Sequence, residues 1–545
     1  MDAKTRDTGR NKRKLIPIID LFSGPGGLAE GFGALRDGAE APLFDIRASF
    51  EKESVAHRTL SLRAFYRAFG HPSDVPGAYY DYLRGKISRE DLLGNSRFLA
   101  QVNKSKEEAH CHELGVTPAE EIDQKIARAL KGDKPWVLIG GPPCQVYSVV
   151  GRSRWRRDNV VKFENDHRHF LYKEYLRIIQ KFRPAIFVME NVRGVLSSTH
   201  GGSPIFQRIL DDLSKPCNGL RYQIRSFNFS GRGLISNPMD YVVKAEDHGL
   251  PQARHRVMLL GVREDLSQLE HVPLQLKAKT TVKDAIGDMP PIRSMLSRGN
   301  DSLESWSRIF HELLPLLEWS GSEKIDLVSR ALQVSKAGVE IPKTAGGRFI
   351  DSNEPYSAEV SDELTEWLYD ERLRGHCQHE ARSHMRRDLH RYLYAACYAM
   401  EFNASPMVDE FPNSLIPEHA NVFDVNVPFR DRFRVQLAGS PSTTVVSHIS
   451  KDGHYYIHYD PAQCRSLTVR EAARLQTFPD NYFFEGNRTE QYWQVGNAVP
   501  PLLARQIAKV VASILNDNTS ANIQQQPTNK IGKSGLFSES LVWQT

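Results

Sequence analysis

The sequence lacks the usual marks of a secreted, zinc-stapled or membrane-spanning chain. Its six cysteines are scattered over 545 residues without a Cys-x-x-Cys pair, which argues against a disulfide framework and for a reducing compartment. No apolar run reaches about 18 residues, so no membrane span is predicted. Residues 1–14 are rich in Lys and Arg and have no apolar core. They therefore do not form a secretory signal, and we expect a solvated basic arm.

A strong excess of charge is also missing. The chain carries 71 Lys and Arg against 66 Asp and Glu, a net charge of +5. This balance is compatible with a nucleic-acid partner but is weak evidence alone. The length suggests two or three domains. His376, Cys377, His379 and His384 offer a possible metal cluster, although a polar interaction surface explains them equally well.

The most informative stretch leads into Cys144. The apolar run 137–139 is typical of a strand buried on both faces. Gly140 and Gly141 let the backbone approach a ligand closely, and the two prolines that follow stiffen the exit. Cys144 then stands at the carboxyl end of a buried parallel strand, where α/β sheets bind ligands. A lone cysteine can be a core filler, but this rigid frame favours a reactive nucleophile.

A second informative stretch opens the chain after the arm. An apolar strand over 15–21, a glycine-rich turn and a helix start match the first βα unit of a nucleotide-binding sheet. A second strand, predicted from Ala41 to Phe50, ends at Glu51, which is placed to accept hydrogen bonds from the two hydroxyls of a ribose. Residues 55–130 are mixed, with a predicted helix over 119–130, and have the character of an insertion.

These stretches are part of seven ordered motifs that together resemble the cytosine-5 DNA methyltransferase family of the bacterial restriction–modification type. The motifs are Asp20-Leu21-Phe22-Ser23-Gly24-x-Gly26-Gly27, Gly141-Pro142-Pro143-Cys144-Gln145-x-x-Ser148, Asp166–Tyr172 with Glu174-Tyr175, Phe187–Val192, Gln252-x-Arg254-x-Arg256, Arg470–Pro479, and Gln494-x-Gly496-Asn497-Ala498-Val499-Pro500-Pro501. The match covers residues 15–262 and about 463–512. The family motif whose Asp contacts the cofactor adenine has no counterpart that we can assign, and Asp123 and Asp133 are weak candidates for it.

The resemblance implies an α/β fold: a doubly wound, Rossmann-like sheet of the S-adenosylmethionine-dependent methyltransferases, with a second, smaller target-recognition domain. It divides the chain into a basic arm (1–14), a catalytic and cofactor-binding domain (15–263), the target-recognition domain (264–460), a return segment that completes the catalytic domain (461–516) and a disordered tail (517–545). Within 264–460 the pattern predicts an amphipathic helix over 380–394 with a basic face, and several short β-like runs.

The implied chemistry is methyl transfer from S-adenosylmethionine to C5 of a cytosine that has been flipped out of duplex DNA. The Cys144 thiolate would add to C6, which makes C5 nucleophilic. Glu190 would donate or share a proton at the base, Arg256 would contact the cytosine carbonyl oxygen, and Arg254 would contact the catalytic loop or a phosphate. The expected cofactor-binding residues are Phe22, Gly24, Gly26, Gly27, Glu51, Pro143, Asn497 and Ala498. The expected DNA-binding residues are Gln145, Ser148, Arg152, Arg154 and Gln252. This chemistry requires no metal.

Three alternatives stay open at the level of sequence. The first is the same chemistry on transfer RNA, and the second is a catalytically silent DNA-binding protein that keeps the fold. The third, methylation of an amino group, would use an Asp/Asn-Pro-Pro-aromatic loop and no cysteine. The main interpretation gives double-stranded DNA as the partner, a possible cognate restriction endonuclease, no membrane, and a place in the bacterial cytoplasm with the nucleoid.

Overall fold

The computed structural model describes residues 15–143, 171–200, 203–230, 237–317, 341–352, 362–417 and 430–515, together with residues 326 and 328. Five residues expected at the active site lie outside these ranges: Cys144, Gln145, Ser148, Arg152 and Arg154. The predicted basic arm and the predicted disordered tail also lie outside them.

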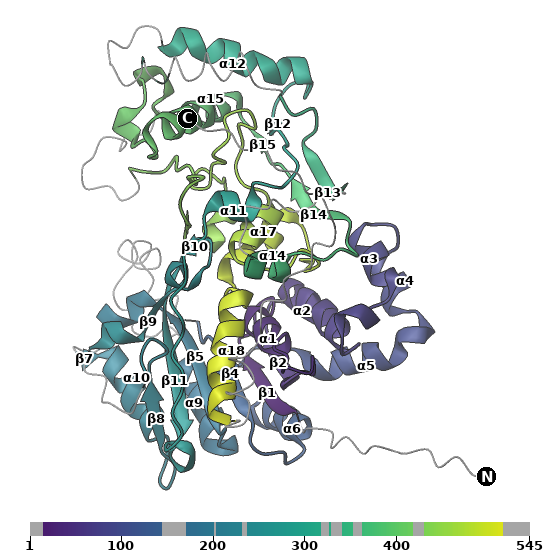
Figure 1. Cartoon of the computed structure of the whole chain (residues 1–545), viewed down its shortest axis with the longest axis vertical. Helices are drawn as coiled ribbons and strands as arrows, with labels where there is room; N and C mark the ends of the chain where they lie inside the picture. The colour runs from purple at the N-terminus through teal and green to yellow at the C-terminus, as the bar shows by residue number, and fades with distance from the viewer. Residues whose placement is uncertain are drawn as a thin grey trace, which may run out of the picture.

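A mixed eight-stranded sheet forms the lower part of the molecule (Figure 1). In spatial order its strands are β3 (Ala109–Cys111), β2 (Phe44–Glu51), β1 (Ile16–Leu21), β4 (Val137–Gly140), β5 (Ile186–Val192), β11 (His255–Arg263) and β8 (Tyr222–Arg225), with β9 (Val242–Lys244) also paired to β11. The strands from β3 to β5 are parallel, and β11 is antiparallel to its neighbours. The strand order reverses between β1 and β4, which is the switch point where such sheets bind ligands.

Helices cover both faces of this sheet, so the predicted doubly wound α/β fold is confirmed. Side chains along each strand alternate between two cores, with Ile18 in one and Ile19 in the other. The helices of the lower part are α1 (Gly27–Gly33), α2 (Ser54–Arg67), α3 (Gly77–Leu83), α4 (Arg89–Leu93), α5 (Leu99–Glu108), α6 (Ala119–Leu130), α9 (Leu171–Phe182), α10 (Ile205–Ser214) and α18 (Pro501–Leu515). Helices α1 and α18 pack in the first core, and α6, α9 and α10 pack in the second.

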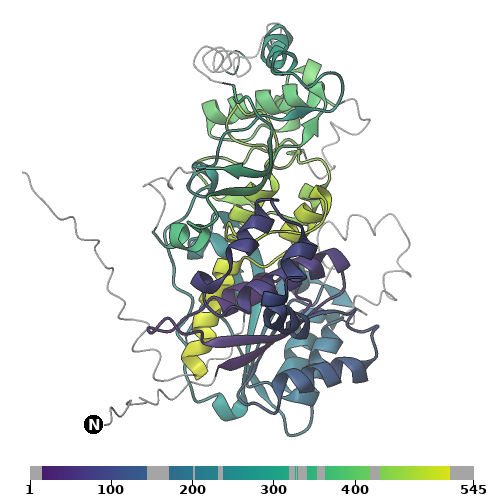
Figure 2. The same ribbon diagram turned by 90° about the vertical axis from the view of Figure 1, so that its right-hand side faces the viewer.

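The upper part is built from helices and small two-stranded sheets, and Figure 2 shows it standing above the large sheet from the side. Its helices are α11 (Val282–Ile286), α12 (Leu303–Leu317), α14 (Asp362–Leu368), α15 (Arg386–Phe402), α16 (Val469–Leu475) and α17 (Arg488–Asn497). The small sheets pair β10 (Gln252–Ala253) with β16 (Ser442–Thr443), β12 (Met295–Leu296) with β15 (Ser383–His384), and β13 (Gly346–Asp351) with β14 (Gly375–Glu380); in the lower part, β6 (Thr199–His200) pairs with β7 (Ser203–Pro204).

Short 3-10 helices connect these elements. They are η1 (Pro72–Asp74), η2 (Ser96–Phe98), η5 (Arg193–Ser197), η6 (Pro238–Tyr241), η7 (Ala245–His248), η8 (Glu264–Leu266), η9 (Val408–Glu410), η10 (Asn413–Leu415) and η11 (Ser447–Ser450).

The predicted basic helix of the upper part needs correction. Residues 375–380 and 383–384 form the strands β14 and β15, and the helix α15 begins only at Arg386. Its cations are held by other residues of the protein: the buried Arg391 pairs with Asp388, and the exposed Arg386 pairs with Glu312. Arg382 is buried, donates to the Ile449 carbonyl and lies over the Tyr492 ring. Of the predicted β-like runs, 434–437, 443–446 and 455–459, only the second overlaps a strand, β16 (Ser442–Thr443), while Val435 and Ile457 form an isolated bridge.

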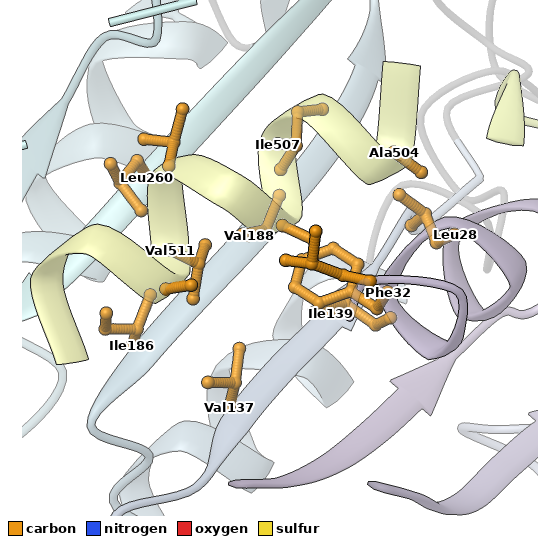
Figure 3. Packing of buried hydrophobic residues seen from close by; sticks show 14 of the residues in the cluster. Leu28, Phe32, Val137, Ile139, Ile186, Val188, Leu260, Ala504, Ile507 and Val511 are labelled. Carbon is orange, nitrogen blue, oxygen red and sulfur yellow. The ribbon is translucent and has the colours of Figure 1, made fainter. Parts of the chain in front are cut away.

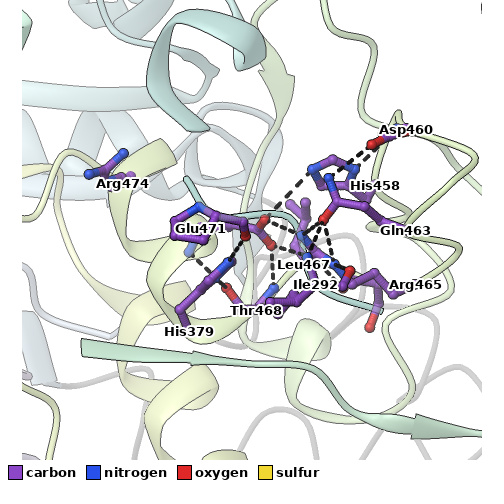
Figure 4. A network of polar contacts seen from close by, with 12 residues as sticks. Ile292, His379, His458, Asp460, Gln463, Arg465, Leu467, Thr468, Glu471 and Arg474 are labelled. Atoms are coloured by element: carbon purple, nitrogen blue, oxygen red, sulfur yellow. Dashed lines mark hydrogen bonds and ion pairs between the residues drawn. The ribbon is translucent and has the colours of Figure 1, made fainter. Parts of the chain in front are cut away.

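A buried polar network joins residues 465–471 of the return segment to the segments around Ile292 and His379 (Figure 4). Arg465 donates two hydrogen bonds to Glu471, at 2.7 and 2.6 Å. Burial alone would raise the pKa of Glu471, but the Arg465 guanidinium lowers it far below its usual value. His379 lies against the Thr468 hydroxyl and the Pro290 carbonyl. Breaking such a buried pair by removing one partner typically costs about 3–5 kcal/mol, so this network fixes how these segments meet.

The return segment ends in α18, which lies along the sheet and beside α1 (Figure 3). By length and composition alone the stretch Arg488–Leu515 could cross a membrane, but 72% of its most apolar window is buried in this core. Two glycines of α1 allow the close approach. A Cβ on Gly27 would lie 2.1 Å from the Val499 carbonyl oxygen, and one on Gly31 would lie 2.4 Å from the Arg505 nitrogen.

Replacing Gly31 with Ala should therefore force α1 and α18 apart. Over-packing of this kind costs about 1–3 kcal/mol, so the free energy of unfolding in urea should fall by that amount. Gly38→Ala is the matched control, because a Cβ there would meet nothing within 4 Å. Equal stability of the two variants would contradict this account of the helix contact.

Candidate active site

The loop after β1 is shaped by three residues with positive φ. Phe22, Gly24 and Gly26 have φ of 57°, 56° and 101°. A non-glycine residue held in this region costs about 1–2 kcal/mol. The loop is fastened to β2, because the Ser23 amide donates to the Phe50 carbonyl at 3.0 Å. A Cβ on Gly24 would meet nothing within 4 Å, so open space lies above this residue.

Glu51 stands beside this open space. Its carboxylate accepts hydrogen bonds from the amides of Gly24 and Glu53, both at 2.8 Å. Burial raises the pKa of Glu51, and these two amides oppose the rise. The carboxylate thus already orients the glycine loop, and its two oxygens have further lone pairs that can accept hydrogen bonds from a ligand.

The return segment closes the other side of the loop. The Tyr482 hydroxyl donates to the Pro25 carbonyl, and a Cβ on Gly26 would lie 3.0 Å from that hydroxyl oxygen. Gly27 faces Val499 in the same way. Gly26 and Gly27 therefore allow the return segment to pack closely against the loop. Of the other two predicted cofactor residues here, Asn497 is exposed and Ala498 is buried in a hydrophobic core.

A carboxylate and a guanidinium meet at the ends of β4 and β5. The Arg256 Nε lies 3.0 Å from the Glu190 Oε1, and their side chains are 15% and 13% exposed. The pairing of β11 with β5 places Met258 opposite Glu190, so Arg256 is the diagonal neighbour of Glu190. A Cβ on Gly141 would lie 2.9 Å from the Glu190 Oε2. Only glycine at position 141 lets the β4 exit run directly over this carboxylate.

Arg254 is deeply buried behind the Glu190–Arg256 pair. Its Nη1 donates to the Val445 carbonyl at 2.9 Å, and its Nε has no partner among the described residues. Burial, with the neighbouring Arg256 charge, lowers the pKa of Arg254 to about 9. Arg254 is therefore still a cation at neutral pH, and no carboxylate in the described part of the chain forms an ion pair with it.

Gln252 was predicted to contact DNA, but its position in the structure does not allow this contact. Its side chain is fully buried and bonds only to protein. The Oε1 accepts from the Val445 amide at 2.7 Å, and the Nε2 donates to the Leu475 carbonyl and to Gln476. With Arg254, Gln252 therefore holds the 442–446 segment against the catalytic sheet. No atom of its side chain is left at the surface for DNA.

Several features were missed in the sequence. The short strand β3 lies inside the predicted insertion and brings Cys111 opposite Glu51 at the sheet edge. No local sequence pattern pointed to Tyr482 or Val445. Each lies more than 150 positions away in the chain from the site residue that it contacts. Neither candidate for the adenine-binding Asp is free. Asp123 pairs with Arg177 and Lys181, and Asp133 pairs with Arg47.

The possible metal cluster is not formed. No three His, Cys, Asp or Glu side chains of the described residues come together in a way that could hold a metal ion. His379 bonds to Thr468 and Pro290, and His384 lies 3.1 Å from the Ser466 hydroxyl.

The residues present fit a nucleoside-containing cofactor. A ribose and the chain attached to it require a glycine backbone with open space above it and a strand-end carboxylate beside it. Gly24 and Glu51 provide these two features. The fold and the site thus define an α/β protein with a site that suits a nucleoside at the switch point of one sheet.

Comparison with known proteins identifies the family. Residues 92–513 match the family model for the C-5 cytosine-specific DNA methylases. A type II methyltransferase of Bacillus paralicheniformis, M.Bpa9945I, is 33% identical over 92% of this chain and 99% of its own length. M.AgeI, a type II methyltransferase of Thalassovita gelatinovora, is 26% identical over 91% of this chain and 99% of its own.

A solved structure supports the fold. A putative DNA modification methyltransferase from an Escherichia coli prophage superposes with a TM-score of 0.52 at 20% identity, over 92% of this chain and 99% of the other. The chain belongs to the C-5 cytosine-specific DNA methylase family and is a DNA (cytosine-5-)-methyltransferase. The family depends on S-adenosylmethionine and acts on DNA.

Replacing Glu190 with Gln keeps the shape of the side chain but removes the carboxylate that faces Arg256. We expect single-turnover methylation to fall by about a hundredfold to ten-thousandfold, the usual worth of general acid–base catalysis, with little change in DNA affinity. Glu246→Gln is the matched control, because the Glu246 carboxylate pairs with His255, the neighbour of Arg256 on β11. A Glu190→Gln rate within a few-fold of wild type would make Glu190 a structural residue.

Proposed function

We propose that this enzyme methylates C5 of one cytosine within a short, specific sequence of duplex DNA, through a covalent bond between the Cys144 sulfur and C6. The observation that carries the proposal is the Glu190–Arg256 pair, which lies against Gly141 at the β4 exit, three positions before Cys144. A proton donor and a fixed cation at this exit face the place where a pyrimidine must sit to meet the thiol.

The chemistry follows from the electronic structure of cytosine. C5 is too weak a nucleophile to attack a methyl group, but addition of a thiolate to C6 gives C5 enamine character. The target base must first leave the helix, because the thiol cannot reach C6 within a stacked duplex. Once bound, S-adenosylmethionine supplies the methyl group. Loss of the C5 proton to a solvent base then restores the C5–C6 double bond as the bond between sulfur and C6 breaks. This step releases the Cys144 thiolate, and Glu190 recovers the proton that it shared with the base.

The charged residues have separate parts in this scheme. Glu190 donates or shares a proton at the ring nitrogen and amino group as the thiolate adds. Arg256 holds the Glu190 carboxylate and points a donor at the cytosine carbonyl oxygen. Arg254 is buried and forms no ion pair with a carboxylate of the described residues, and its positive charge favours the thiolate form of a nearby cysteine.

The cofactor would be held at the loop after β1. Glu51 accepts the ribose hydroxyls, the backbone at Gly24 gives close approach, and Phe22 packs on the adenine. Pro143 and Asn497 approach from the catalytic strand and from the return segment. Gly26, Gly27 and Ala498 shape the site through their packing. No step of this chemistry calls for a metal.

The biological setting is proposed from the relatives. The similar proteins are named type II methyltransferases, so we infer a protective methylase of a restriction–modification system, with a cognate endonuclease as partner. The target-recognition domain is assigned to residues 264–460, which supply surface beyond the catalytic sheet for reading base edges. Such an enzyme works in the bacterial cytoplasm on the nucleoid. Gln145, Ser148, Arg152 and Arg154 follow the β4 exit in sequence and are assigned to contacts with the flipped strand.

The nucleophile can be tested directly. Wild-type protein should form an irreversible adduct with duplex DNA that carries 5-fluorocytosine at the target, because fluorine blocks the final elimination. Cys144→Ser should give neither adduct nor methyl transfer and should still bind DNA; Cys111→Ser, which changes an exposed thiol, should keep both. Methyl transfer by Cys144→Ser would overturn the assignment.

The specificity can be tested in a host without cytosine methylation. Expression of the wild type should place 5-methylcytosine in one short recurring context, because each bidentate base contact discriminates by about 1–3 kcal/mol. Cys144→Ser in the same host is the control. Methylation spread over cytosines without context would contradict the recognition assignment, and methylation confined to RNA would move the substrate to the transfer-RNA alternative.

A further inference from the structure

A basic groove lies between α3 and the β13–β14 hairpin, which Figure 1 shows side by side. The groove has a volume of about 610 Å³. It is lined by Gly77, Tyr80, Arg84, Lys86, Asp351, Arg372 and Arg374. Four of these side chains are cationic and one is acidic, so the groove presents a concentrated positive charge.

Two of the four cations are free at the surface. Lys86 and Arg374 are exposed, and neither forms an ion pair with a carboxylate in the part of the chain that the structure describes. Exposed cations without a partner keep their full charge available to a ligand.

The other two cations are held in place by backbone. Arg84 donates to the carbonyls of Arg372 and Leu373, and Arg372 donates to those of Pro72, Ser73 and Val75. Carbonyl oxygens orient a guanidinium but do not neutralise it. Among the described residues, Asp81 lies 3.5 Å from the Arg84 guanidinium, and Asp370 accepts a hydrogen bond from the backbone amide of Arg372 rather than from its guanidinium. The walls of the groove are therefore fixed and remain positive.

The neighbouring hollow does not share this excess of positive charge. A second hollow of about 580 Å³ begins on the other side of the α3–α4 turn, where Gly85 packs against Arg348. Its cations are nearly balanced by acids, and Glu485 accepts hydrogen bonds from Arg58, Arg89 and the Tyr82 hydroxyl. The two hollows therefore differ in net charge.

The groove also joins two distant parts of the chain. Helix α3 follows the strand that ends in Glu51, and β13–β14 lies within the segment assigned to target recognition. The two share a hydrophobic core that includes Tyr79, Leu373 and Cys377. A polyanion in the groove would therefore contact both parts at once.

We propose that this basic groove binds backbone phosphates of duplex DNA outside the recognised sequence. The proposal rests on the enzyme acting on duplex DNA. Among the described residues that line the groove, Tyr80 is the only aromatic one, and it is 2% exposed, with Arg84 and Arg372 over its ring. The groove thus offers charge but no exposed ring for base stacking, which favours phosphates of a duplex over bases of a single strand.

The test is the double variant Lys86→Ala/Arg374→Ala. Binding is measured by fluorescence anisotropy on two duplexes that share one unmethylated target site: a short duplex that ends just beyond the site, and a long duplex that extends several helical turns. We expect weaker binding to the long duplex only. Each phosphate contact adds about 0.9 to the slope of log affinity against log salt. The slope for the long duplex should therefore fall by about 1.8, and the advantage of the wild type should shrink about tenfold between 50 and 200 mM salt.

Two controls accompany the variant. Arg128→Ala/Lys215→Ala removes two exposed cations elsewhere and should leave both affinities unchanged. Lys86→Arg/Arg374→Lys exchanges the cations and should retain the long-duplex advantage. The turnover number on the short duplex should stay at the wild-type value for all three variants.

Four results would overturn the proposal. Unchanged binding to the long duplex would show that the groove does not contact DNA, and equal losses on both duplexes would place it inside the recognised site. A loss independent of salt, together with a lower melting temperature, would mean a packing role. A selective loss of single-stranded RNA binding would mean another partner. Absence of methylation by the wild type itself would instead contradict the proposed function, so the two failures are distinguishable.

Discussion

The approach of the return segment to the first helix is the contact on which the rest of the structure depends. Gly27 and Gly31 leave no room for side chains, so Val499 and the start of α18 lie directly on α1. This contact brings Tyr482 over the glycine loop. Without it the loop after β1 would face solvent on the side that the return segment now covers. The loop after β1 is therefore enclosed by segments from both ends of a long chain through backbone-to-backbone packing.

A second set of contacts joins the upper part to the large sheet. Gln252 and Arg254 precede β11, and both bond to Val445, while Gly496 lies against Ser447. A displacement of the 442–448 segment must therefore disturb the strand that carries Arg256. Buried hydrogen bonds that cannot be replaced by water are costly to break, so this link is rigid.

Cations that are paired with carboxylates and cations that are not lie in different parts of the molecule. The upper part and the return segment bury several arginines in ion pairs, such as Arg465 with Glu471 and Arg474 with Asp288 and Asp480. These pairs fix geometry and leave little net charge. By contrast, Arg254 forms no ion pair with a carboxylate of the described residues, and neither do Lys86 and Arg374 in the basic groove. Uncompensated positive charge thus remains at two places, where a thiolate and a phosphate are expected.

The sequence by itself determined the order of the elements and the local chemistry of the site. The glycine turn, Glu51 at the end of β2 and Glu190 near the end of β5 follow from short-range patterns, because parallel strands end at one edge of a sheet. Only the tertiary structure decided which polar groups are bonded to other residues of the protein and which remain available to a ligand. Gln252 was expected at DNA and is buried, and the cations around α15 were expected on a free face and are paired. The groups that bond to these side chains lie far away in the sequence. Val445, for example, is 191 positions from Arg254. No local pattern of residues carries information on contacts of that range.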